Sequence, residues 1–532
     1  MKFLLAAFVL CSSFSFAQGT RKDSIDVLRY NLDISINDSS DVIYATEFIT
    51  LIYNNDCDSF SLDFSSLNEN GRGMIVTEVM NLSQNNFKIP FYHSQEKLWI
   101  TLDKDERKNE EKDTSLFAIV YSGIPIDGLV IGENKYGKRT FFGDNWPNRA
   151  HNWFACVDHP SDKASVHFKI TAPAHYEVVA TGENVANVKN KNGDISHTFN
   201  SDIQLPTKVM VFGAADFQVQ EEEVEFDFPL SSWIYQQENV SSFSDLSSAD
   251  EILSFFIENI GNYPFEKLAN VQSTTRYGGM ENAGNIFYDE NAFSGNGTME
   301  ALIAHEIAHQ WFGNSASESD WQHLWLSEGF VTYFTDLYWE SKYGTGEMNK
   351  RLSKERVKVI RFSKQYNHAV IDTNYTNLLH LLNPNSYQKG AWVLHMLRNE
   401  VGENDFWKIV RSYYEKYQFS NASSTDFIEI VNEITEKDYS SFFNQWLKRS
   451  GQPKLKAEIK QKGKKINIEL NQVQKGQNYS FPIEVLFIYK DGTKELKKYC
   501  LSEEVLLTFF KTNKKLDHFI LDPNVLLLFE EQ

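Results

Sequence analysis

The chain has 532 residues, of which 42% are hydrophobic and 23% charged, and its net charge is −20. This length is typical of about two to four domains, and the composition is that of a folded globular protein, which excludes disorder, collagen and coiled coil. An acidic surface repels phosphate backbones and anionic lipids, so neither nucleic acid nor a membrane surface is an expected partner.

Residues 1–17 have the pattern of a secretory signal peptide. Lys2 provides the positive start, residues 3–10 are apolar, and residues 15–17 fit the small-x-small cleavage rule. A lipoprotein signal at Cys11 is the alternative, but the residue before this cysteine is too bulky. The apolar run is too short to cross a bilayer, and no later run reaches about 18–20 residues. We therefore expect export, to the periplasm or the medium, without stable membrane insertion.

Residues 18–218 are predicted to form a mostly antiparallel β domain. Apolar and polar residues alternate near its start, and residues 45–53 form a second run rich in β-branched and aromatic side chains. The alternating positions are Leu28, Tyr30, Leu32, Ile34 and Ile36.

Residues 219–451 are predicted to form a mainly helical domain, and residues 452–532 a small β-sandwich. Helical spacing begins near Ser248 and ends at Ser450-Gly451-Gln452-Pro453. Alternation then returns, with a hairpin signal at Asp491-Gly492. The predicted fold class is therefore multidomain α+β, with the helical domain between two β domains.

The most specific motif is His305-Glu306-Ile307-Ala308-His309. Residues four apart lie on one face of a helix, so both imidazoles can reach one metal ion while Glu306 lies beside it. We expect Thr298 to cap the start of this helix.

A hydrolytic zinc site needs three protein ligands and one open position. Glu328 lies at the start of a second amphipathic segment. The stretch between His309 and Glu328 is long enough for a loop and a helix that doubles back, so Glu328 is the predicted third ligand. Glu318 and Asp320 are alternatives on composition, but both lie in a polar stretch that we expect to be solvated.

These four residues, with this spacing, resemble the zinc site of the gluzincin aminopeptidases, the family of aminopeptidase N, aminopeptidase B and the leukotriene hydrolase. Three further stretches match the family in order. They are Trp153-Phe154-Ala155-Cys156-Val157-Asp158, Gly278-Gly279-Met280-Glu281-Asn282 and Tyr387-Gln388-Lys389-Gly390. We expect an exported, bacterial-type member that lacks the large helical C-terminal domain of many family members, and the resemblance implies that the helical domain is thermolysin-like.

The resemblance also implies a role for each site residue. His305, His309 and Glu328 would bind one Zn²⁺ per chain, Glu306 would be the general base for the zinc-activated water, and Tyr387 would stabilise the oxyanion. The remaining positions would bind substrate, with Glu281 on the free α-ammonium group and the backbone of the same segment beside the peptide. These substrate-binding positions are Gly278, Gly279, Met280, Glu281 and Asn282.

Two positions depart from the family pattern. The family usually has a glutamine of the N-terminal domain beside the amine-binding glutamate, whereas this chain has Asp144 and Asn145 as candidates for a second amine anchor. Ser327 precedes Glu328 where many members have asparagine.

The sequence thus predicts a zinc aminopeptidase that hydrolyses the N-terminal peptide bond of peptides with a free N-terminus; it does not specify the oligomeric state. One alternative is an endopeptidase of the wider H-E-x-x-H class, which Glu281 disfavours because an anchored carboxylate opposes binding in mid-chain. Another is a catalytically silent peptide-binding protein on the same fold. The Gly-Gly-Met-Glu-Asn form also suggests an epoxide hydrolase side activity, by analogy alone.

Overall fold

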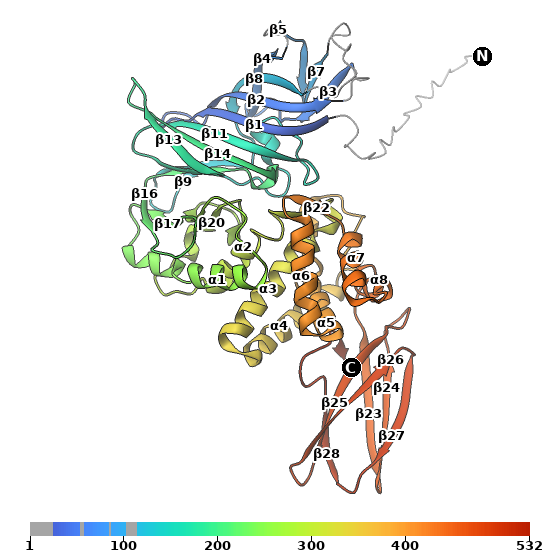
Figure 1. The fold of residues 1–532 in the computed structure, drawn as a ribbon. Helices are drawn as coiled ribbons and strands as arrows, with labels where there is room; N and C mark the ends of the chain where they lie inside the picture. Colours follow the sequence, from blue (N-terminus) through green and yellow to red (C-terminus); the bar gives the residue numbers. More distant parts are fainter. Residues whose placement is uncertain (1–24, 54–57, 84–86, 103–113) are drawn as a thin grey trace, which may run out of the picture.

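The computed structural model describes residues 25–53, 58–83, 87–102 and 114–532. The predicted signal peptide, residues 1–17, lies outside the described residues. Three bodies follow one another along an elongated molecule, with the N-terminal strands at one end, the helices in the middle and a second set of strands at the other end (Figure 1). This arrangement confirms the predicted α+β fold class.

The N-terminal body is built on an eight-stranded sheet in the order β13-β14-β11-β1-β2-β8-β4-β5. Its pairs are antiparallel except for β1 with β11. The strands are β1 (Ile25–Ser35), β2 (Ile43–Tyr53), β4 (Gly73–Asn81), β5 (Phe87–Lys88), β8 (Ser115–Ile124), β11 (Lys163–Ala172), β13 (Glu183–Lys189) and β14 (Ile195–Pro206). Two smaller sheets complete the body. They consist of β3 (Ser59–Asp63), β7 (Lys97–Thr101) and β6 (Phe91–Ser94), and of β12 (Glu177–Ala180), β15 (Phe212–Ala215), β10 (Arg139–Gly143) and β9 (Leu129–Glu133).

The predicted alternation in the first strand is interrupted by a bulge between Val27 and Arg29. The bulge adds one residue to β1, so the buried face continues from Val27 to Tyr30 and leaves Leu28 half-buried. From Tyr30 onward the expected positions face the core.

The Trp153–Asp158 motif lies inside the N-terminal body rather than on its surface. Trp153 and Phe154 are fully buried with their ring centroids 4.7 Å apart, and Val157 N donates to the Tyr30 hydroxyl at 3.1 Å. Asp158 accepts from Thr207 Oγ1 at 2.9 Å. This motif therefore joins the sheets of the N-terminal body to the segment that leads into the next one.

The central body begins with a five-stranded sheet in the order β16-β17-β18-β20-β19. Its strands are β16 (Phe217–Glu221), β17 (Leu230–Tyr235), β18 (Leu268–Ser273), β19 (Gly279–Met280) and β20 (Asn285–Asp289). The domain boundary expected at residue 218 falls inside β16, because Phe217 already pairs with Tyr235 of β17.

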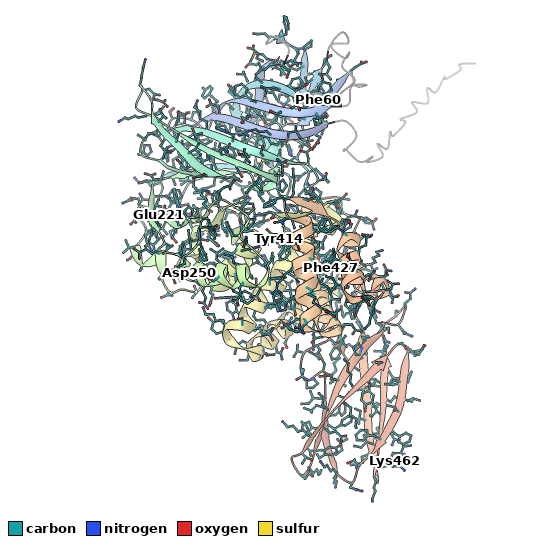
Figure 2. All side chains as sticks on the ribbon, viewed as in Figure 1. Phe60, Glu221, Asp250, Tyr414, Phe427 and Lys462 are labelled. Atoms are coloured by element: carbon teal, nitrogen blue, oxygen red, sulfur yellow. The ribbon has the colours of Figure 1, made fainter. Side chains whose placement is uncertain are left out.

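Eight α-helices make up most of the rest of the central body (Figure 1). They are α1 (Ala249–Asn259), α2 (Glu300–Ala308), α3 (Trp325–Tyr343), α4 (Thr345–Ser363), α5 (Gly390–Val401), α6 (Glu403–Tyr417), α7 (Ser424–Thr435) and α8 (Ser440–Leu447). A short ladder of β21 (Ala316–Glu318) and β22 (Ser420–Ala422) links two of the loops. Side chains such as Tyr414 and Phe427 fill the space between these helices (Figure 2).

Two sheets that face each other form the C-terminal body. One contains β27 (Val505–Lys511), β24 (Lys465–Gln472), β23 (Lys454–Lys462) and β29 (Glu530–Glu531), and the other β26 (Lys494–Leu501), β25 (Phe481–Tyr489) and β28 (Leu516–Leu521). Phe487 of β25 meets Phe510 of β27 edge to face, with ring centroids 4.9 Å apart, so the sheets share one core. Among the described residues, no helix is both long and apolar enough to cross a membrane.

Candidate active site

The two histidines of the H-E-x-x-H motif lie at the C-terminal end of α2. His305 and Glu306 belong to the helix, and His309 is its C-cap residue. The predicted N-cap was wrong, since Met299 occupies that position without a side-chain cap. The turn before α2 is held by Asp245 instead, whose carboxylate accepts from the backbone N–H groups of residues 294–297 at 2.6–3.0 Å.

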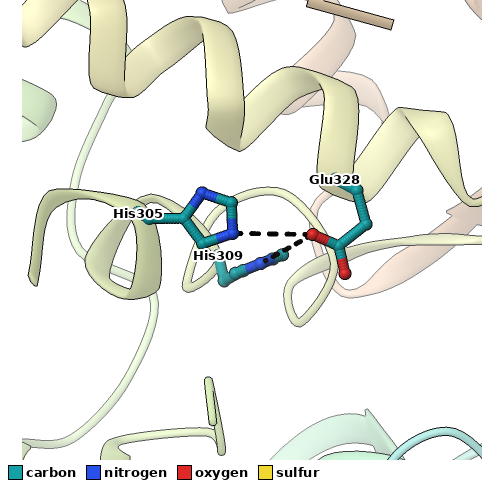
Figure 3. A group of neighbouring side chains, drawn as sticks. All are labelled: His305, His309 and Glu328. Atoms are coloured by element: carbon teal, nitrogen blue, oxygen red, sulfur yellow. Dashed lines mark ion pairs between the residues drawn. The ribbon is translucent and has the colours of Figure 1, made fainter. Parts of the chain in front are cut away.

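Glu328 reaches the same point from the first turn of α3, which packs against α2. Its Oε2 lies 3.6 Å from His305 Nε2 and 3.4 Å from His309 Nε2 (Figure 3). Ligand atoms on a tetrahedral zinc ion are about 3.4 Å apart when each bond is about 2.1 Å. Two imidazole nitrogens and one carboxylate oxygen at this separation are therefore a donor set that fits zinc.

The orientation of His309 is fixed by groups behind it. Its Nδ1 lies 3.1 Å from Phe312 O and 3.2 Å from Ser327 Oγ. Donation from Nδ1–H to the carbonyl turns Nε2 toward Glu328, where it can bind a metal ion once it has lost its proton. Gly313 allows this packing because its φ is +117° and a Cβ there would lie 2.4 Å from Ser327 Oγ.

A second acidic group adjoins the first. One ligand atom from each of Glu281, Glu306 and His309 lies within 4.8 Å of the others, and all three side chains are buried. Burial raises the pKa of Glu306 well above its usual range and also raises that of Glu281. Burial acts to lower the pKa of His309, but Glu281 and Glu328 outweigh it and raise this pKa to about 9. The site thus gathers negative charge around one point, which suits a divalent cation.

Glu281 is held through its backbone, which leaves its carboxylate free. Its carbonyl oxygen accepts from Gln310 Nε2 at 3.0 Å and from Asn314 Nδ2 at 2.5 Å. Its buried Oε1 has no hydrogen-bond partner among the described residues. The sequence analysis assigns no role to Gln310 or Asn314; Gln310 directly follows His309, and Asn314 lies five residues after it.

The Gly278–Asn282 segment runs beside this cluster as an edge of the central sheet. Among the described strands, β19 pairs with β20 alone and forms the end of the strand order, and its other edge faces the site. A Cβ on Gly279 would lie 2.4 Å from Glu306 Oε1, whereas one on Gly278 would meet only the Leu302 side chain at 3.7 Å. Gly279 therefore permits the close approach of the strand to Glu306.

Tyr387 comes from a short π-helical turn, Asn385–Lys389, that leads directly into α5. Its ring is parallel to that of His305 within 9°, at a centroid distance of 6.1 Å. Burial raises the pKa of its hydroxyl well above 10, so the group stays protonated and can donate. Lys389, at the end of the same turn, is fully buried and donates to Arg449 O and Gly451 O.

Most of the predicted residues surround a small central cavity that opens into a larger one, whereas Gly278 lines only the larger cavity and Asn282 lines neither. The central cavity, of about 70 Å³, is lined by Glu281, Tyr387, His305, Glu306, His309 and Glu328, together with Trp146, Tyr277, Gly279, Met280 and Leu382. An adjoining cavity of about 390 Å³ shares Gly279, His305, Glu306 and Tyr387 and continues toward Arg351 and Lys358 of α4. A peptide can therefore extend from the donor set in that direction.

Asp144 and Asn145 do not line the central cavity, so neither can anchor the amine of a substrate bound there. Asp144 is buried against the guanidinium of Arg149, and Asn145 Nδ2 donates to Thr207 O and Met210 O at 2.9 and 2.7 Å. Among these three neighbours, it is Trp146 that lines the central cavity. The expectation of a polar second anchor at residues 144 and 145 is therefore corrected.

Glu318 is not the solvated residue that the sequence suggested. It lies in β21, is fully buried, and its Oε1 accepts from Lys208 Nζ at 2.5 Å. Lys208 comes from the N-terminal body, 110 positions away, so no local pattern indicated the pair. Asp320 accepts from Gln322 N at the start of a short 3₁₀ turn, and neither carboxylate joins the donor set.

Two family models match this chain. The peptidase M1 N-terminal domain matches residues 27–209, and the peptidase family M1 domain matches residues 245–446. Human glutamyl aminopeptidase is 26% identical over 68% of this chain and 40% of its own length. Alanine/arginine aminopeptidase of Saccharomyces cerevisiae is 26% identical over 72% of this chain and 49% of its own. The chain thus spans less than half the length of these curated relatives.

Two solved structures share the fold. Aminopeptidase A from Legionella pneumophila, solved in complex with aspartic acid, has a TM-score of 0.80 at 17% identity. The matched region includes 96% of this chain and 60% of the Legionella chain. A mutant M1 zinc metallopeptidase from Deinococcus radiodurans has a TM-score of 0.68 at 21% identity. The matched region includes 80% of this chain and 94% of the Deinococcus chain. On the two domain matches and the order of its motifs, this chain belongs to peptidase family M1.

Proposed function

We propose that the chain is a zinc-dependent aminopeptidase that removes single residues from the N-terminus of peptides. The observation that carries this proposal is the buried, unpartnered Oε1 of Glu281 in the same cavity as the donor set of His305, His309 and Glu328. A carboxylate held there suits a free α-ammonium group one residue from the reacting bond. The aminopeptidases among the family relatives support the same activity.

His305, His309 and Glu328 would hold the zinc ion. When bound, zinc supplies a Lewis acid that polarises the scissile carbonyl and makes water a nucleophile near neutral pH. Their shared position between α2 and α3 leaves the side toward Glu306 and Tyr387 open to substrate.

Glu306 would move the proton. Its carboxylate is in the cavity next to the donor set, so it can take a proton from the attacking water and pass it to the leaving amine. Burial raises its pKa, which strengthens it as a base. Tyr387 would donate its hydroxyl proton in a hydrogen bond to the developing oxyanion.

The substrate's amino end would lie between Glu281 and Trp146. Glu281 provides the charge, and the indole of Trp146 provides an aromatic surface that attracts a cation. The free edge of β19 would pair with the peptide backbone like an added strand. An N-acetylated or mid-chain segment would leave Glu281 buried without a counter-charge, which disfavours the endopeptidase alternative.

The test of this mechanism is Glu306→Gln, which keeps the size and removes the base. Turnover of an aminoacyl-arylamide should fall by about 10²–10⁴-fold while zinc content, measured by atomic absorption, stays at one per chain. Near-normal turnover with bound zinc would contradict the role of Glu306. A wild-type protein that holds zinc and cleaves no substrate would favour the silent peptide-binding alternative.

We also propose that the chain is exported, on the basis of the signal-peptide pattern in residues 1–17. Mass spectrometry of the mature protein should find a first residue at position 18. Retention of Met1 in protein recovered from the native host would contradict export.

A further inference from the structure

A second large cavity, of about 470 Å³, lies where the catalytic helices meet the C-terminal sandwich. Three segments form its walls. They are the end of α4, the connection from α8 to β23 at residues 448–454, and the loop between β24 and β25 at residues 474–479. This volume is within the range of sites for small molecules.

The walls carry one sign of charge. Lys448, Arg449, Lys454 and Lys475 line the cavity, and no aspartate or glutamate does. Such a concentration stands out in a chain with a net charge of −20. A concave surface lined by cations focuses the field and attracts anions.

These four cationic side chains form few hydrogen bonds or ion pairs with the described residues. Arg449 Nη1 donates to Asn478 O at 3.0 Å and its guanidinium lies 5.6 Å from the Tyr479 ring centroid. Lys454 Nζ lies 3.5 Å from Glu530 Oε2. Lys448 and Lys475 are exposed and form no ion pair with any residue in the described part of the chain.

An unpartnered amide lies in the same wall. Gln452 is 3% exposed, and neither its Oε1 nor its Nε2 has a hydrogen-bond partner within the described ranges. Buried amides are nearly always paired, so an orphan in the wall of a cavity points to a group that the protein alone does not provide.

The cavity wall is tied directly to the segment that carries Tyr387. Lys389 Nζ donates to Arg449 O at 3.0 Å and to Gly451 O at 2.8 Å, and both of these residues line the cavity. Lys389 closes the π-helical turn that contains Tyr387. A displacement of residues 449–451 therefore acts on the support of the proposed oxyanion donor.

We propose that this cavity is a regulatory site for a small molecule with an oxyanion group, a phosphate or a carboxylate. The anion binds Lys448, Arg449, Lys454 and Lys475, and Gln452 pairs with a neighbouring polar atom of the ligand. Occupation shifts residues 449–451 and, through Lys389, the position of Tyr387. The regulatory part rests on the proposed aminopeptidase function, whereas the binding part does not.

Calorimetric titration of the full zinc-loaded chain tests the binding, with inorganic phosphate in one arm and succinate in the other, at constant ionic strength. The double variant Lys448→Gln/Lys475→Gln should weaken binding of the active probe by about tenfold or more. The matched control is Lys462→Gln, an exposed lysine at the far end of the sandwich (Figure 2). This control should bind as wild type does. The arm that binds identifies the source of the oxyanion.

Binding that is unchanged in the double variant, or the absence of binding in both arms up to about 10 mM, would overturn the site. Regulation is tested by measuring kcat with and without a saturating concentration of the probe. The probe should change kcat by about twofold or more in wild type and Lys462→Gln but not in the double variant. Binding without this change would overturn the regulation. If wild type shows no turnover at all, the aminopeptidase proposal fails while the titration still reports on the site.

Discussion

At the scale of single residues, the approach of Gly279 to Glu306 is among the tightest constraints in the site. A Cβ on Gly279 would lie 2.4 Å from Glu306 Oε1 and 2.6 Å from its Cγ and Cδ. No side chain fits there unless the glutamate moves. The glycine is therefore required by the position of the proposed base and not by a turn, since Gly279 lies in strand β19.

Gly279→Ala should therefore lower catalytic activity without unfolding the protein. We expect kcat to fall by about 10²–10⁴-fold, because the displaced Glu306 no longer reaches the water, while zinc content and thermal stability stay close to wild type. Gly278→Ala is the matched control, because its Cβ meets only Leu302 at 3.7 Å. Steady-state kinetics of both variants is the measurement, and equal activities would contradict the role of the close approach.

Trp146 should contribute to the binding of the substrate's amino end. Trp146→Leu removes the aromatic surface from the cavity that contains Glu281, so KM for a free-amine substrate should rise by about 2–30-fold, with a smaller change in kcat. Trp146→Phe keeps an aromatic ring and should lie between the leucine variant and wild type. A leucine variant with unchanged KM would show that Glu281 binds the ammonium alone.

At the scale of elements, the site depends on how closely α3 and α5 cross. A Cβ on Gly390 would lie 2.9 Å from the Cα of Gly329, and one on Gly329 would lie 2.8 Å from the Cα of Gly390. This contact sets the distance between the helix that carries Glu328 and the turn that carries Tyr387. Backbone atoms on both sides leave little room for adjustment.

Gly390→Ala should destabilise the catalytic domain by about 1–3 kcal/mol, because the added methyl group forces the two backbones apart. Gly346→Ala in α4 is the control, since it has open space around its Cβ and should be neutral or slightly stabilising. Scanning calorimetry of the two variants is the measurement. A Gly390→Ala variant as stable as wild type would mean that α3 and α5 can separate without penalty.

The parts of the site that were predictable from sequence are those set by spacing within one element. His305 and His309 lie four apart on one helix, and Glu328 follows on the next, so their meeting required only that two consecutive helices pack. The burial of Glu318 could not be predicted, because its partner Lys208 comes from another body. The positions of Asp144 and Asn145 outside the cavity could not be predicted either, because Arg149, Thr207 and Met210 hold these side chains only in the folded chain.

At the scale of the whole molecule, His395 connects the catalytic helices with the C-terminal body. It lies on α5, where its Nδ1 is 3.1 Å from the Tyr333 hydroxyl and its Nε2 is 2.9 Å from Val525 O. Burial lowers its pKa to about 4, so the imidazole is neutral when folded. The neutral form donates from Nε2 to the carbonyl and accepts from the tyrosine.

The unfolded chain binds a proton at His395 below about pH 6.5, whereas the folded chain does so only near pH 4. Stability from this residue is therefore complete above about pH 6.5 and is lost as the pH falls through that window, by about 2–3 kcal/mol between pH 7 and 4.5. The difference in unfolding free energy between these two pH values should be smaller by this amount in His395→Gln than in wild type. Equal differences would show that His395 does not titrate on unfolding.

In the proposed function, Glu281 and the donor set act together on peptides with a free amino end. The most direct test is an assay of the purified chain on aminoacyl-arylamides and their N-acetylated counterparts, with and without a zinc chelator. We expect cleavage of the free-amine set alone, abolished by the chelator and restored by zinc. Equal cleavage of the acetylated set, or cleavage that survives removal of the metal, would contradict it.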